Sequence, residues 1–103
     1  MIYDVTNKNF IEEVLNSQKP VLVDFNAPMC ASCEKISPHL DEIDRENPDA
    51  VKIVTVNINN ELELAANNRI LSIPTLVLFD GGKEKGRISG YNSKKQILDL
   101  INC

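Results

Sequence analysis

Residues 21–33 read Val21-Leu22-Val23-Asp24-Phe25-Asn26-Ala27-Pro28-Met29-Cys30-Ala31-Ser32-Cys33, and they carry more information than any other part of this chain. The first five residues form an apolar run interrupted by one carboxylate, which is typical of a strand buried on both faces. The last four place two cysteines three residues apart, where a helix is expected to begin. A strand, a Cys-x-x-Cys pair and a helix in this order indicate thiol–disulfide chemistry.

Strands and helices alternate along the chain on both sides of this stretch. The patterns predict strands at 2–5, 21–26, 51–58, 75–79 and 85–89, and helices from about 6–9 to 19, from 29–30 to 47, at 61–68 and from 93 to about 101. Asn9 with Glu12, and Ser93 with Gln96, have the spacing of helix-capping boxes. Pro38 lies inside the second helix, where we expect a kink.

The element order βαβαβαββα predicts an α/β fold: a central mixed sheet of about five strands flanked by four helices. The alternating part requires a parallel core with helices on both faces, and the last two strands add an antiparallel hairpin at the edge. In such sheets the chemistry gathers beyond the carboxyl ends of the strands. Cys30 falls just past the end of the central strand, so its position agrees with its chemistry.

Length and composition limit the possible functions. A chain of 103 residues predicts a single domain over 1–103, and we expect a monomer. The net charge of −4 argues against nucleic acid or an anionic membrane as partner. The first residues, Met1-Ile2-Tyr3-Asp4, lack the pattern of a signal peptide, so we expect a cytoplasmic protein. Thiols stay reduced there, and a vicinal pair is then catalytic or metal-binding rather than a structural cross-link.

The spacing of Cys30 and Cys33 suits a reversible disulfide. Residues i and i+3 on a helix lie ~5–6 Å apart, within the range that a disulfide requires. The first cysteine then lies at the helix N-terminus, where free N–H groups and the helix dipole favour an anion. We therefore expect Cys30 to be the attacking thiolate and Cys33 the resolving thiol. No bound cofactor is needed, because the two sulfur atoms carry the electrons.

A structural zinc site is the alternative for the cysteine pair. Such a site needs about four ligands, and only His39 and Cys103 remain as candidates. His39 lies in the middle of a predicted helix, Cys103 is the last residue, and there is no second Cys-x-x-Cys pair. The redox interpretation is therefore favoured, with no metal site expected.

Asp24 is the second candidate catalytic residue. A carboxylate between Val23 and Phe25 in a buried strand loses its water, which raises its pKa. It could then accept the proton of Cys33, directly or through a water. The alternative is a carboxylate that is simply paired or solvated at a sheet edge. Beside the cysteine pair, the catalytic interpretation is the stronger one.

The chain resembles the thioredoxin family over its whole length. The resemblance rests on Val21-Leu22-Val23-Asp24-Phe25, Ala27-Pro28-Met29-Cys30-Ala31-Ser32-Cys33-Glu34-Lys35-Ile36-Ser37-Pro38, Val56-Asn57-Ile58-Asn59, Ile73-Pro74-Thr75-Leu76-Val77-Leu78-Phe79, Gly81-Gly82 and Gly90, in the family's order and spacing. From the residues alone, the Ile73–Pro74 bond could be cis or trans, and trans is far more common.

The resemblance implies a thioredoxin fold with Cys30 as nucleophile, Cys33 as resolving cysteine and Asp24 as buried acid–base. It also implies that Pro74 is cis and that the Ile73 backbone pairs with an extended substrate segment. The apolar docking rim would consist of Met29, Ala31, Ile73, Pro74 and Gly90.

Several residues depart from the family's pattern. Met29 and Asn26 stand where the family usually has tryptophan, and Ala31-Ser32 replaces Gly-Pro between the cysteines. Thr55 stands where a lysine often lies near the buried aspartate, so we expect a high pKa for Asp24.

The expected function is that of a protein-disulfide reductase and electron carrier of the thioredoxin type. Its partners would be a thioredoxin reductase, NADPH- or ferredoxin-linked, and proteins that contain disulfides. The alternative from another class is a binding module whose apolar rim holds a partner without turnover. Replacing both cysteines by serine separates the two, because only the carrier loses its function.

Overall fold

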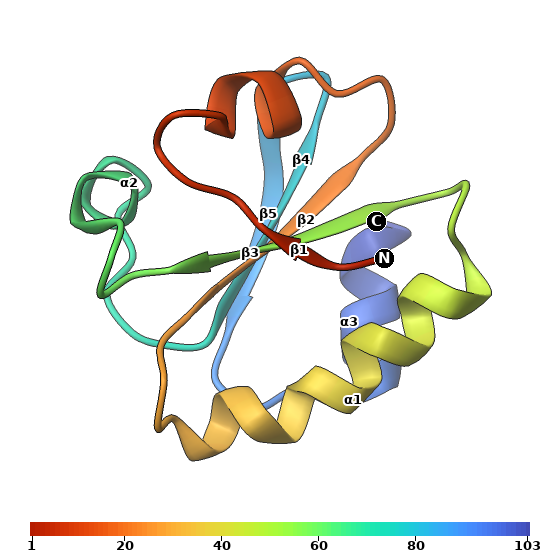
Figure 1. Cartoon of the computed structure of the whole chain (residues 1–103). Helices are drawn as coiled ribbons and strands as arrows, with labels where there is room; N and C mark the ends of the chain where they lie inside the picture. The colour runs from red at the N-terminus through yellow and green to blue at the C-terminus, as the bar shows by residue number, and fades with distance from the viewer.

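β2 (Val21–Asn26) lies at the centre of a five-stranded sheet in the computed structural model, which describes residues 1–103. The strand order is β1-β3-β2-β4-β5, and the sheet has helices on both faces (Figure 1). The other strands are β1 (Tyr3–Asp4), β3 (Lys52–Asn57), β4 (Thr75–Asp80) and β5 (Lys83–Ser89). The helical elements are η1 (Ile11–Leu15), α1 (Ala31–Glu46), α2 (Leu62–Asn67) and α3 (Lys94–Ile101). This is the predicted α/β fold with five strands and four helices.

The antiparallel part of the sheet begins further inside than the sequence indicates. β1, β3 and β2 are parallel to one another, but β4 runs antiparallel beside β2, and β5 is antiparallel to β4. Thr75, the first residue of β4, pairs with Phe25 near the end of β2. The chain therefore starts β4 at the end of the sheet where β2 and β3 finish. This places the segment before β4 beside the loop that follows β2.

Two apolar cores lie on opposite faces of the sheet. On one face, α1 and α3 cover the sheet through Ile36, Leu40, Ile43 and Ile97. On the other face, η1 and α2 contribute Val14 and Leu64, with Phe10 just before η1. β2 supplies both cores, because successive side chains of a strand point to opposite faces. Leu22 belongs to the first core and Val21, Val23 and Phe25 to the second, so Asp24 points to the α1 face.

The first helix differs from its prediction. Instead of an α-helix that extends almost to Pro20, the structure has one wide turn, η1, in which the Asn16 N–H donates to the Ile11 carbonyl 2.9 Å away, five residues back. The expected capping box is absent. The Asn9 side chain accepts from the Thr6 N–H at 2.8 Å, so it stabilises the preceding turn rather than the helix.

The other helices follow their predictions more closely. α1 begins immediately after Cys30 and contains Pro38 without ending there, while the kink expected at Pro38 remains a prediction. α3 begins with the predicted capping box: the Ser93 hydroxyl accepts from the Gln96 N–H, and the Gln96 side chain accepts from the Ser93 N–H. No helix combines the length and the apolar composition needed to cross a membrane.

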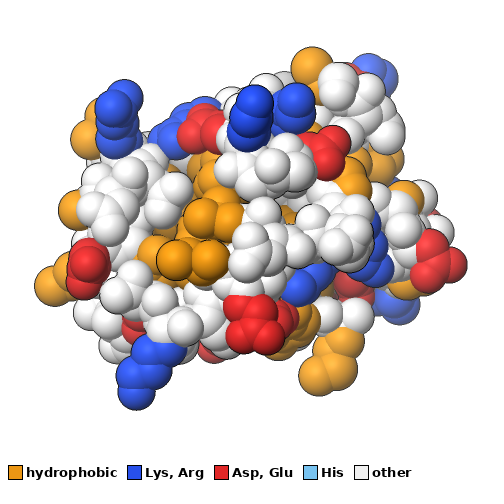
Figure 2. All heavy atoms as spheres, turned by 90° about the horizontal axis from the view of Figure 1, so that it is seen from above, with side chains coloured by type: hydrophobic (Ala, Val, Ile, Leu, Met, Phe, Trp, Pro, Cys, Tyr) orange, Lys and Arg blue, Asp and Glu red, His pale blue; other side chains and the backbone are white.

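The face that carries η1 is mixed in character (Figure 2). Hydrophobic side chains gather near the middle of this view, and Lys, Arg, Asp and Glu side chains surround them. Between η1 and α2 there is a groove of about 270 Å³, lined in part by Phe10, Ile11, Leu15 and Leu64. This groove lies on the opposite side of the sheet from α1 and from the cysteine pair.

Candidate redox site

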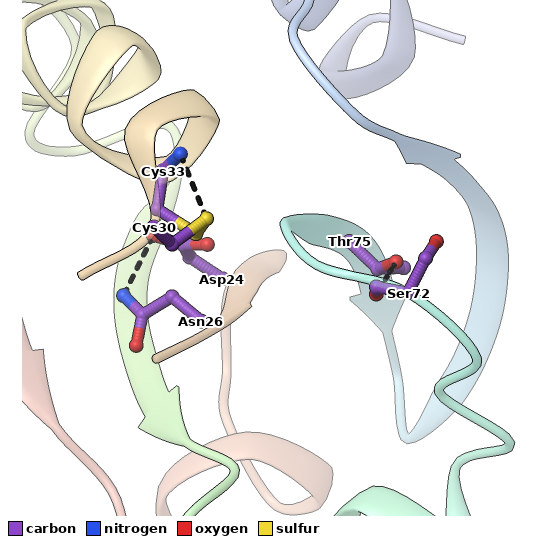
Figure 3. Close-up of a disulfide and its surroundings, with 6 residues drawn as sticks. All are labelled: Asp24, Asn26, Cys30, Cys33, Ser72 and Thr75. Atoms are coloured by element: carbon purple, nitrogen blue, oxygen red, sulfur yellow. Dashed lines mark hydrogen bonds between the residues drawn. A yellow bond between two sulfur atoms is a disulfide. The ribbon is translucent and has the colours of Figure 1, made fainter. Parts of the chain in front are cut away.

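Cys30 and Cys33 form a disulfide at the start of α1, so the structure represents the oxidised protein (Figure 3). Their Cα atoms are 5.2 Å apart, which agrees with the helical spacing expected from the sequence. Cys30 is the N-cap residue of α1, with extended backbone angles, and Cys33 lies in the first turn. β2 ends four residues before Cys30, and the short Ala27–Pro28–Met29 loop turns the chain into the helix.

The start of α1 favours negative charge on Cys30. The Cys33 N–H points at the Cys30 sulfur and donates to it at 3.2 Å. This N–H is one of the groups that have no partner within the helix, and the helix dipole adds a partial positive charge at the same end. Both effects stabilise a thiolate more than a neutral thiol. In the reduced protein, the same donor would favour ionised Cys30.

The two cysteines differ in access to solvent. Cys30 is half-buried, whereas the Cys33 residue is only 8% exposed. A bulky disulfide substrate can therefore approach Cys30 more easily than Cys33. The neighbouring Met29 side chain is almost completely exposed, at 99%, and its backbone lies in the left-handed region with φ 60°.

The segment before β4 lies beside the loop that follows β2, because Thr75 pairs with Phe25. The Ile73–Pro74 peptide bond is cis, as the resemblance implies. The Gly90 N–H donates to the Pro74 carbonyl at 2.8 Å and fastens this segment to the end of β5. Ile73 makes no backbone–backbone hydrogen bond, so its N–H and carbonyl remain available to another chain. Pro74 itself is buried, whereas Ile73 and Gly90 are partly exposed.

Asp24 is buried on the α1 face of β2, with only 4% of its surface exposed. It lines a cleft of about 340 Å³ together with Cys33, Met29 and residues of α1, β1 and β3. Loss of water raises the pKa of Asp24 from 3.8 to about 6, although a hydrogen bond from Asn26 acts in the opposite direction. This is the direction expected from the sequence. A carboxyl group with this pKa can exchange a proton near neutral pH.

Asn26 is a residue of the site that sequence reasoning did not assign. Its side-chain nitrogen donates to Asp24 Oδ2 at 3.2 Å (Figure 3). The signal was present in the sequence, because residues 24 and 26 of a strand share one face. Thr55 stands where the family often has a lysine. Its hydroxyl donates a hydrogen bond to Asp4 rather than to Asp24.

The remaining candidates lie apart from this chemistry. His39 Nε2 is 3.1 Å from the Tyr91 hydroxyl, and Cys103 is a free, exposed thiol. No three His, Cys, Asp or Glu side chains are grouped so that they could hold a metal ion.

Comparison with known proteins agrees with the geometry. The thioredoxin family model matches residues 1–103. A thioredoxin from Rickettsia typhi is 40% identical over 102 residues, which cover 99% of this chain and 97% of the relative. A thioredoxin from Pyropia yezoensis is 38% identical over 98% of this chain and 94% of its own length. A bifunctional thioredoxin reductase/thioredoxin from Mycobacterium leprae is 38% identical over 92% of this chain, which correspond to 21% of that larger protein. With the fold, the cysteine pair and these relatives in agreement, the chain belongs to the thioredoxin family.

Proposed function

We propose that this chain is a protein-disulfide reductase and electron carrier, organised as a single thioredoxin domain over residues 1–103. The observation that carries the proposal is the linked pair Cys30 and Cys33 at the N-terminus of α1. Cys33 and the buried carboxyl group of Asp24 line the same cleft. Together they provide a nucleophile, a resolving thiol and a proton acceptor. The redox function needs no further group, because the sulfur atoms hold both electrons.

In the first step, the Cys30 thiolate attacks one sulfur of a substrate disulfide. A bond forms between Cys30 Sγ and that sulfur, the substrate S–S bond breaks, and the second substrate sulfur leaves as a thiolate that takes a proton. The Cys33 N–H and the helix dipole support the thiolate before the attack. Burial of Cys33 favours attack through Cys30.

In the second step, Cys33 releases the substrate. The Cys33 thiol gives its proton to Asp24, and the resulting thiolate attacks Cys30 Sγ. The Cys30–Cys33 bond forms, the mixed disulfide breaks, and the second substrate thiolate leaves. The substrate gains two electrons and this chain loses two. The pKa of about 6 for Asp24 means that the carboxylate is available as a base at neutral pH.

We propose that Met29, Ala31, Ile73, Pro74 and Gly90 form the docking rim for the substrate. Met29 and Ala31 are exposed on either side of Cys30, and Ile73 offers an unpaired backbone N–H and carbonyl. An extended substrate segment can add to Ile73 in the manner of an additional strand. Pro74 is buried, so it would offer the substrate little surface. Its role in the rim would be to hold the backbone of Ile73 in place.

The partners follow from the redox cycle. A thioredoxin reductase, NADPH- or ferredoxin-linked, would return the dithiol, and protein disulfides would be the substrates. The name of the Mycobacterium leprae relative joins a thioredoxin reductase and a thioredoxin in one protein, which supports this pairing. The free thiol of Cys103 fits a reducing compartment, so we propose a cytoplasmic location.

Trapping the mixed disulfide tests this function. All variants are made in a Cys103→Ser background, which removes the additional thiol. Cys33→Ser should accumulate disulfide-linked complexes through Cys30, because the resolving thiol is absent. Cys30→Ser is the matched control and should accumulate none at this site. Equal trapping by both variants would contradict the assigned order of attack.

The double variant Cys30→Ser/Cys33→Ser separates a carrier from a binding module. If the protein is a carrier, the double variant reduces no protein disulfides. The rate of disulfide reduction is measured with reductase and substrate in excess. A module that only holds a partner keeps its full activity in a binding assay and has no turnover to lose. Wild-type protein that reduces no disulfide under these conditions would overturn the proposed function.

A further inference from the structure

One oxygen of the Asp24 carboxyl group has a partner and the other has none. Asp24 Oδ2 accepts from Asn26 Nδ2 at 3.2 Å. Asp24 Oδ1 is fully buried and makes no hydrogen bond. A buried oxygen without a donor is uncommon in folded proteins and calls for an explanation. The two oxygens therefore have different chemical surroundings, although they belong to one group.

No cation compensates Asp24 in its cleft. The charged groups that line the cleft are Asp4 from β1, and Glu34 and Asp41 from α1, all of them carboxylates. β3 contributes the neutral side chains of Thr55 and Asn57, and Leu76 of β4 pairs with Asp24 from the other side. The Asn26 amide is therefore the one side chain that donates a hydrogen bond to Asp24.

We propose that Asn26 is a positioning residue for proton transfer: its amide holds Asp24 Oδ2 and leaves Oδ1 free to take the proton of Cys33. This inference rests on the proposed function and goes beyond it, because it assigns the two carboxyl oxygens different tasks. In this step the Cys33 S–H bond breaks, the Asp24 Oδ1–H bond forms, and the electron pair stays on Cys33 Sγ. Asn26 neither gains nor loses a proton.

The chemistry of the amide explains why this position matters. A donor to a carboxylate stabilises the ionised form more than the protonated form. Asn26 thus offsets part of the cost of burying the charge, and the base remains ionised at neutral pH. The hydrogen bond also limits rotation of the carboxyl group, which keeps Oδ1 in a fixed direction. An apolar side chain of similar size would remove both effects.

Titration of Asp24 tests the interaction directly. The carboxyl carbon of Asp24 is followed by NMR against pH in reduced wild-type protein, in Asn26→Leu and in Asn57→Leu. Asn57 is the matched control, because it is the register partner of Asn26 on β3, lines the same cleft and makes no hydrogen bond to Asp24. We expect the pKa of Asp24 to rise above about 6 in Asn26→Leu only.

Kinetics test the role in proton transfer. The release of a preformed Cys30 mixed disulfide is measured from pH 5 to 9 in the same variants. Because fewer Asp24 groups are ionised, Asn26→Leu should release substrate about two- to fivefold more slowly near pH 6. Near pH 8, where Asp24 is ionised in both proteins, the deficit should shrink to the part that comes from the lost orientation of Oδ1. A merely structural defect would lower the rate equally at every pH.

A double-mutant cycle completes the test. In an Asp24→Asn background, Asn26→Leu should have no further effect on the pH profile, because Asn26 acts through Asp24. An unchanged Asp24 titration in Asn26→Leu, or an equal effect in both backgrounds, overturns the inference while the proposed function stands. Absence of any disulfide release in wild-type protein would instead overturn the proposed function.

Discussion

Asp24 combines burial with a titratable group, and this combination has an energetic cost. The side chain is buried on the α1 face of the sheet with one unpaired oxygen, so the charged form is less stable than it would be in water. The pKa of about 6, compared with an ordinary value of 3.8, corresponds to a cost of about 3 kcal/mol when the group is ionised. The fold keeps this residue at the expense of stability.

Replacing Asp24 by asparagine should therefore stabilise the oxidised protein at neutral pH. The native state binds the Asp24 proton more tightly than the unfolded chain does, so ionisation lowers stability as the pH rises from about 4 to about 6. Above that range, Asp24→Asn should raise the free energy of unfolding by about 3 kcal/mol at most. Below pH 4 the two proteins should differ little. Urea unfolding at pH 3.5 and pH 7.5 measures both differences.

A matched control is Asp4→Asn. Asp4 lines the same cleft, but it is exposed and accepts a hydrogen bond from Thr55. Because Asp4 is exposed to water, we expect this replacement to leave the free energy of unfolding nearly unchanged. A stability gain in Asp24→Asn that is the same at both pH values would show that ionisation of Asp24 is not its cause.

Among the helices, α3 depends most clearly on its cap. Ser93 and Gln96 satisfy each other's backbone N–H groups at the start of α3, whose Ile97 is fully buried against the sheet. Ser93→Ala should lower the free energy of unfolding by about 1 kcal/mol. Ser37→Ala is the control, because Ser37 is exposed inside α1 and makes no hydrogen bond through its side chain. Thermal or urea unfolding of both variants gives the comparison, and equal losses would contradict the capping role.

These helices also show how far the sequence predicts the fold. β2 and α3 were predictable because a continuous apolar run and a Ser-x-x-Gln box are local signals. The first helix is not predictable in this way. The Asn9 side chain accepts a hydrogen bond from the Thr6 N–H instead of capping a helix, and only tertiary packing decides between these two contacts. The sequence does not predict the antiparallel placement of β4 beside β2 either, since no local pattern fixes the direction of a strand.

The residues of the candidate site could be located from the sequence to a similar extent, and their roles stay predictions. The cysteine pair and Asp24 could be found from spacing and from one carboxylate in an apolar run. The sequence places Asn26 and Asp24 on one face of β2, but the hydrogen bond between them depends on the placement of α1 and β3. The contact between Gly90 and Pro74 joins residues that are sixteen positions apart and depends on the pairing of β4 with β5.

For the chain as a whole, the disulfide is a small constraint. It joins residues only three positions apart, so it removes little freedom from the unfolded chain. A closed loop of this size stabilises a protein by about 2 kcal/mol in the chain-entropy model. Reduction should therefore lower the free energy of unfolding by about that amount and leave the protein folded. Urea unfolding of the Cys103→Ser variant, with and without a reductant, measures the difference. A reduced protein that is unfolded at 25 °C would contradict this expectation.

The left-handed backbone at Met29 has a consequence for how this family member could evolve. Branching at Cβ is strongly disfavoured at φ 60°, so valine, isoleucine and threonine are poor replacements there. Drift at this exposed position is confined to glycine, asparagine and side chains without such branching. The main chain thus restricts which side chains can stand at this position of the proposed docking rim.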